Sequence, residues 1–102
     1  QDWDILLCPQ MATPAFEHDH RPMEERTLAV NGVPQPYFQQ LFWAGLITVA
    51  YLPSTVFPTG ASQEGLPIGL QAVGAEYHDH TCIDFARLMA DEMGGFVAPA
   101  GY

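Results

Sequence analysis

The stretch GLPIGLQAVG, residues Gly65 to Gly74, decides the fold. It contains no lysine, serine, cysteine or histidine, so none of its side chains can attack a substrate or transfer a proton. Its glycines and proline recur among apolar residues, which predicts a turn followed by a strand that ends at Gly74. Gly69 and Gly74 permit close backbone approach, and the amide of Gln71 can satisfy buried polar groups. We therefore interpret this stretch as scaffold.

Two further strands are predicted around this stretch. Residues 54–58 (STVFP) are rich in β-branched residues and predict a buried strand that pairs with it as a hairpin. Residues 3–9 (WDILLCP) contain a continuous apolar run, which is typical of a strand covered on both faces. Residues 10–36 hold several prolines and an Asn-Gly turn signal, and they predict a long loop.

Two helices complete the predicted order of elements. Residues 36–52 are apolar around nearly the whole circumference, which predicts a fully buried helix. Residues 78–95 predict a second helix with Asp79 as its N-cap and two glycines at its end. The expected core-facing stripe of this helix consists of Ile83, Ala86, Met89, Ala90 and Met93. The resulting order of strand, loop, helix, strand, strand and helix predicts an α/β fold.

Composition limits the classes of function. The 102 residues carry a net charge of −9, with three arginines and no lysine, so nucleic acid and anionic membranes are not expected partners. The longest apolar run, Leu41 to Leu52, is shorter than the roughly 20 residues that span a bilayer. No charged side chain occurs from Thr27 to Gln63, which predicts burial against something outside this chain. The first residue is Gln1 rather than Met, which suggests a processed chain or a fragment.

Several side chains are candidates for chemistry. His18-Asp19-His20 and His78-Asp79-His80 could bind a divalent metal ion, but their spacing matches no zinc motif, and solvated polar residues and a helix N-cap explain them better. Cys8 lacks a neighbour that would lower its pKa, and the serines occur in no nucleophile elbow. The residues alone predict no catalytic group, no metal and no cofactor in this chain.

Residues 51–86 resemble the C-terminal part of amidase signature enzymes. The match includes the Gly-Leu-Pro-x-Gly-x-Gln block that starts at Gly65, and residues 4–16 and 94–102 resemble flanking segments of that family. The matching positions are Leu52, Pro53, Pro58, Gly60, Gly65, Leu66, Pro67, Gly69, Gln71, Gly74 and Asp79.

The resemblance implies that residues 1–102 are the C-terminal segment of one three-layer α/β/α domain with a mixed sheet, without its N-terminal catalytic part. It implies a hydrolase that converts carboxamides to a carboxylate and an amine or ammonia. A nucleophilic serine, a second serine in a cis peptide and a lysine would act from upstream of this chain. We therefore expect these residues to be inactive alone.

The resemblance also implies a substrate site. Alignment places Leu41 at a position that contacts substrate in relatives, with Phe38 and Phe42 beside it, so an uncharged acyl group is favoured. The expected partner is a small amide in the cytoplasm, and homodimer formation is left open. Two alternatives remain: the ammonia-releasing subunit of a tRNA-dependent amidotransferase, and a small metal-binding module that uses both His-Asp-His stretches.

Overall fold

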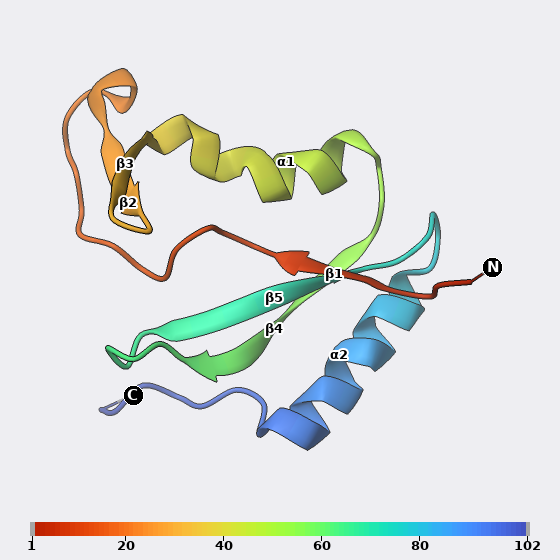
Figure 1. Cartoon of the computed structure of the whole chain (residues 1–102). Coiled ribbons are helices and arrows are strands. Elements are labelled where there is room, and N and C mark those ends of the chain that lie inside the picture. The colour runs from red at the N-terminus through yellow and green to blue at the C-terminus, as the bar shows by residue number, and fades with distance from the viewer. Residues whose placement is uncertain (1, 102) are drawn as a thin grey trace.

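The computed structural model describes residues 2–101, and Figure 1 shows the arrangement of their helices and strands. Within this range the elements are β1 (Leu6–Pro9), η1 (Met23–Glu25), β2 (Thr27–Val30), β3 (Val33–Pro36), η2 (Tyr37–Leu41), α1 (Phe42–Val49), β4 (Ser54–Ala61), β5 (Pro67–Val73) and α2 (Asp79–Met93), where η denotes a 3-10 helix. The mixture of helices and sheet confirms the predicted α/β class.

The main sheet has the order β1-β5-β4, and both of its strand pairs are antiparallel. The predicted hairpin is therefore confirmed as β4 and β5, with Gln71 of the central strand opposite Cys8 on one side and Val56 on the other. A register shift between Pro58 and Gly60 marks a bulge in β4. Every strand pair within residues 2–101 is antiparallel, so the mixed sheet stays a prediction.

The two helices contact opposite faces of the main sheet, as Figure 1 shows. Alternate residues of a strand point to opposite faces. On one face, Cys8 and Val73 pack against Ile47 of α1. On the other face, Phe57 of β4 meets Phe85 of α2 edge-on, with ring centroids 5.9 Å apart. The sheet is thus covered by one helix on each side.

The expectation that β1 is covered on both faces, and that β4 is a buried strand, is wrong within the described residues. In β1 only Cys8 is buried, whereas Leu6 and Leu7 are exposed. In β4 only Phe57 is buried, and Val56 is exposed. Leu6 and Val56 lie on the α1 face, where one short helix cannot cover three strands, whereas Leu7 points to the α2 face.

The predicted loop of residues 10–36 is partly wrong, because its second half forms the β2–β3 hairpin. Asn31 and Gly32 have φ angles of +52° and +77°, the left-handed pair that a two-residue hairpin turn requires. Counting outward from the turn, Pro34 and Pro36 fall at non-hydrogen-bonded positions, where a missing N–H does no harm. These two prolines concealed the strand signal in the sequence.

The helix predicted over residues 36–52 is shorter than expected and begins as the 3-10 turn η2. Within this chain only one side of the segment is buried: Ile47 is its only buried apolar residue, while Phe38 is 66% exposed and Val49 79% exposed. Because the sequence predicts burial against something outside this chain, burial of the other side stays a prediction. The rest of the chain packs against only one side of this helix. No helix within residues 2–101 has both the length and the hydrophobicity required to cross a bilayer.

The second helix is confirmed, but its predicted N-cap is wrong by one residue. His78 is the N-cap residue and makes no side-chain capping bond, and Asp79 is the first helical residue. The helix ends as expected at Gly94, with φ of +90°. The predicted stripe is wrong at Ile83 and Met93, which are 54% and 45% exposed. It omitted Cys82 and Phe85, which lie on the side of the helix that contacts the sheet.

Candidate substrate groove

The segment from η2 to α1 is held at both ends by local backbone geometry. Pro36 precedes η2 with φ of −57°, a value that suits entry into a helix. At the other end, the N–H groups of Tyr51 and Leu52 donate to the carbonyls of Thr48 and Ile47, which is the Schellman pattern. Tyr51 has φ of +54°, although glycine usually occupies this position.

The inner face of α1 is fixed to the sheet by packing and by one buried amide. Ile47 packs on Cys8 and Val73, with Trp43 and Leu52 beside them. Gln71 is only 3% exposed, and its Nε2 donates to the carbonyl oxygen of Pro9 at 3.0 Å and to that of Trp43 at 3.4 Å. The predicted role of Gln71 as a partner for buried polar groups is confirmed.

The outer face of the same segment forms an open groove of about 680 Å³. We call it the η2–α1 groove; its lining residues are Phe38, Gln39, Leu41, Phe42, Gly45, Leu46 and Val49. No lining residue is charged. The structure therefore brings the three residues expected from the sequence, Phe38, Leu41 and Phe42, to one surface.

Sequence reasoning missed the remaining lining residues, which are Gln39, Gly45, Leu46 and Val49. For the last three the signal was present, since positions 38, 41, 42, 45, 46 and 49 follow the helical spacing that places residues on one face. The inner face of the segment is equally apolar, so the sequence did not show which of the two faces would line a groove. A Cβ atom built on Gly45 meets no atom within 4 Å, so this glycine leaves open space in the groove.

Neither cysteine is activated. Burial raises the pKa of the Cys8 thiol, and a hydrogen bond from Gln71 offsets this only in part. Burial also raises the pKa of Cys82, whose Sγ donates to the carbonyl of Pro53 at 3.5 Å. Both thiols are free and buried. Since the thiolate is the reactive form, these side chains are structural.

The His-Asp-His stretches form no metal site in the described part of the chain. Asp19 is bound by Arg21 through a short ion pair, with Nη2 to Oδ2 at 2.6 Å. His18 and His20 lie with their ring centroids 6.1 Å apart. No group of three or more His, Cys, Asp or Glu side chains within residues 2–101 is arranged to hold a metal ion. The metal-binding alternative therefore gains no support.

These features define an α/β unit that presents an apolar groove, and within residues 2–101 they include no activated nucleophile. The sequence profile of the family described as Amidase matches residues 1–83. The chain is 30% identical over 95 residues to a glutamyl-tRNA(Gln) amidotransferase subunit of Bartonella tribocorum, covering 93% of this chain and 18% of that protein.

A human relative extends the comparison to nearly the whole chain. Fatty-acid amide hydrolase 2 of Homo sapiens is 32% identical over 101 residues, which cover 99% of this chain and 16% of that protein. The chain spans less than a fifth of the length of these curated relatives. The chain belongs to the amidase signature family, as the resemblance around Gly65 to Gly74 predicted.

Proposed function

We propose that the protein is an amide hydrolase, and that the η2–α1 groove holds the uncharged acyl part of its substrate. The observation that carries this proposal is the neutral, apolar lining of the groove in a chain of the amidase family. Transfer of an apolar acyl group from water to such a surface is favourable. A charged group would lose its hydration there without gaining an ion-pair partner. Phe38, Leu41 and Phe42 are the proposed contacts.

The reaction converts a carboxamide to a carboxylate and an amine or ammonia. Its chemical groups would come from outside these residues, because the chain has no lysine and its thiols are buried and protonated. The family resemblance supplies a serine nucleophile, a second serine in a cis peptide and a lysine, all upstream. On this proposal the chain contributes sheet, covering helices and one wall of the pocket.

The test is a matched pair of substitutions in the complete protein. Leu41 and Leu88 are 52% and 53% exposed, but only Leu41 lies in the groove. We expect Leu41→Asp to raise KM for amides with long apolar acyl groups by at least about tenfold, because the carboxylate must lose water against the acyl chain. We expect Leu88→Asp to leave KM unchanged. Equal KM values in the two variants would contradict the substrate role of the groove.

A second candidate is the ammonia-releasing activity of an amidotransferase, which is favoured by the names of several relatives. Glutamine carries two charges on its backbone atoms, and the groove offers neither a cation nor a carboxylate to bind them. We therefore rank an uncharged amide first. Release of ammonia from glutamine faster than from apolar amides by the complete protein would reverse this order.

We also propose that the chain forms one end of a three-layer α/β/α domain with a mixed sheet. In the described residues, β1 and β4 each have one unpaired edge, and the helices already cover opposite faces. Cytoplasmic localisation is proposed because the two cysteines are free rather than paired in a disulfide. Homodimer formation stays a prediction that size-exclusion chromatography of the complete protein would test.

A further inference from the structure

Arg26 differs from the other two arginines in its electrostatic surroundings. Arg21 forms an ion pair with Asp19, and Arg87 forms ion pairs with Asp84 and Asp91. Within residues 2–101 no carboxylate lies within ion-pair distance of Arg26. Since the sequence has three arginines and no lysine, Arg26 is the one fixed side-chain cation of the described residues that is not already neutralised by a contact.

The Arg26 side chain is held in place by contacts that leave its outer edge free. Its Nε donates to the carbonyl oxygen of Arg21 at 2.6 Å, and the guanidinium carbon lies 5.8 Å from the ring centroid of Tyr37. The backbone N–H of Tyr37 donates to the carbonyl of Arg26 at 2.9 Å, and Phe16 packs edge-on against the Tyr37 ring. The two terminal nitrogens have no hydrogen-bond partner within the described residues.

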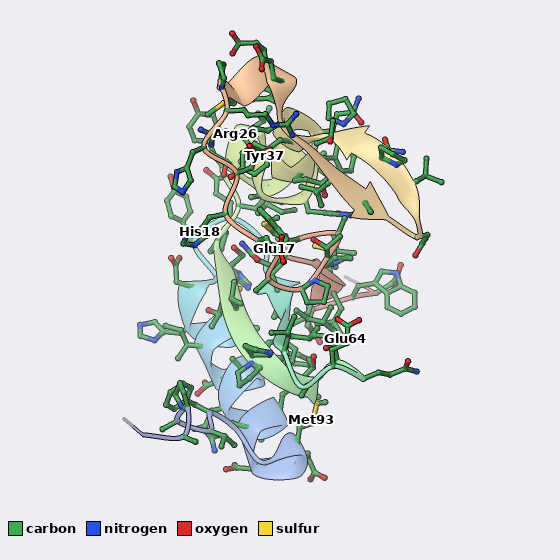
Figure 2. All side chains as sticks on the ribbon, turned by 90° about the vertical axis from the view of Figure 1, so that its left-hand side faces the viewer. Glu17, His18, Arg26, Tyr37, Glu64 and Met93 are labelled. Atoms are coloured by element: carbon green, nitrogen blue, oxygen red, sulfur yellow. The ribbon has the colours of Figure 1, made fainter. Side chains whose placement is uncertain are left out.

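A hollow of about 260 Å³ lies beside this guanidinium. We call it the Arg26 hollow; its lining residues are Phe16, His18, Asp19, His20, Arg26 and Tyr37. Figure 2 shows Arg26 next to Tyr37, with His18 on the same side of the molecule. The hollow therefore combines a planar cation that lacks an ion-pair partner with the rings of Phe16 and Tyr37.

The charge of the hollow favours a singly charged ligand. Asp19 also lines the hollow and attracts Arg26 weakly, but its ion-pair partner is Arg21, so Arg26 keeps most of its charge for a ligand. Glu17, Glu24 and Glu25 lie on the same segment, so the wider field is negative. That field repels any anion, and it repels a doubly charged phosphate more strongly than a monocarboxylate, while both can accept two hydrogen bonds from the guanidinium.

We propose that the Arg26 hollow binds the carboxylate of a small organic monoanion whose apolar body rests on Tyr37 and Phe16. The two terminal nitrogens of Arg26 donate to the two carboxylate oxygens, and the aromatic rings contact the rest of the ligand. This site is separate from the η2–α1 groove: Tyr37 lines the hollow, and the next residue, Phe38, lines the groove. The inference goes beyond the proposed hydrolysis and is tested by binding alone.

The test titrates the complete protein with benzoate, and with benzyl alcohol as a neutral analogue of the same shape. NMR shifts of Tyr37 and of the two histidines in the hollow report the location of binding. We expect saturable shifts with benzoate and none with benzyl alcohol. Equal shifts with both ligands, no saturation with benzoate, or tighter binding of inorganic phosphate would each overturn the proposal.

Three variants separate a specific site from a general charge effect. We expect Arg26→Gln to weaken benzoate binding by at least about tenfold, as for loss of charge-assisted hydrogen bonds. Arg26→Lys keeps the charge but lacks the planar fork, and we expect it to lose most of the affinity as well. Arg87→Gln, which removes the same charge on α2, should bind benzoate like the parent protein. Full affinity in Arg26→Lys, or an equal loss in Arg87→Gln, would contradict the proposed geometry.

Discussion

Gly74 shows why a single residue in the opening stretch has to be glycine. A Cβ atom at this position would lie 2.7 Å from the Sγ of Cys82 and 3.3 Å from the carbonyl oxygen of His78. Cys82 is 1% exposed and cannot move aside easily. We expect Gly74→Ala to lower the free energy of unfolding by about 1–3 kcal/mol, the usual cost of overpacking. Chemical denaturation of the complete protein measures this change.

Gly45→Ala is the matched control. Gly45 lies inside α1, and an added Cβ meets nothing within 4 Å. Alanine favours a helix over glycine by about 0.5–1 kcal/mol, so we expect no loss of stability. A similar destabilisation by both substitutions would show that the close approach at Gly74 is not the cause. The sequence predicted this close approach from glycine spacing, but it could not identify Cys82 as the neighbour.

Asp19 gives a pH-dependent prediction. Hydrogen bonds from the side chain and backbone of Arg21 lower the pKa of Asp19 from 3.8 to about 2. Because the folded pKa lies below the ordinary value, the stabilising contribution is complete above pH 3.8. It is lost as the pH falls from 3.8 through about 2. The sequence showed the Asp-x-Arg spacing, but only the loop conformation brings the two charges together.

NMR titration of the Asp19 carboxyl carbon in the complete protein checks this prediction. The midpoint should lie near 2, and Arg21→Gln should move it towards 3.8. Arg87→Gln serves as the control, since its ion pairs are formed within α2 and should not affect Asp19. A midpoint near 3.8 in the parent protein would rule out the ion pair in solution.

At the scale of elements, Gln71 connects β5 to both β1 and α1. We expect Gln71→Leu to lower the free energy of unfolding by about 1–3 kcal/mol, because the partly buried carbonyls of Pro9 and Trp43 would lose their donor. Amide hydrogen exchange in α1 should also accelerate, since the helix loses its polar attachment to the sheet.

Gln63→Leu provides the control for this substitution. Gln63 is exposed in the connection between β4 and β5, so its replacement should change stability by less than about 0.5 kcal/mol. Exchange in α1 should remain unchanged in this variant. If both leucine variants behaved alike, the attachment of α1 through Gln71 would have no energetic importance.

The elements differ in how well the sequence predicted them, for physical reasons. The β4–β5 hairpin and the end of α2 were predicted because glycines and apolar runs specify them locally. The β2–β3 hairpin was missed because proline normally argues against a strand. Pro34 and Pro36 are tolerated because the pairing register places them at non-hydrogen-bonded positions, and the sequence alone does not show that register. Burial of the outer face of α1 stays a prediction, because hydrophobicity does not identify which part of the protein covers that face.

The whole molecule is more open than a self-contained protein of its size. Its accessible surface is 7919 Å², whereas a compact protein of 11.2 kDa exposes about 5,700 Å². Its radius of gyration is 15.5 Å, compared with about 13 Å for a compact domain of 100 residues. The charge-free stretch from Thr27 to Gln63 had already indicated missing cover. That the cover belongs to the same amidase domain stays a prediction.

The last prediction concerns the 102 residues expressed without any other part of the protein. Exposed side chains such as Phe38, Phe42 and Val49 give this chain an apolar surface that water disfavours. We expect strong binding of a hydrophobic dye, a broad thermal transition and no amide hydrolysis. Differential scanning calorimetry and dye fluorescence measure the first two properties.

Two substitutions locate the surface responsible. Phe42→Gln should reduce dye fluorescence, because Phe42 is 60% exposed within the η2–α1 groove. Ile83→Gln, at a residue 54% exposed on α2, should have little effect because it lies outside that groove. A sharp cooperative melt without dye binding would mean that the exposed face of α1 is stable in water. In that case a covering part of the domain would no longer be needed to explain the apolar surface, and the proposal that this chain forms one wall of an amidase pocket would lose its physical basis.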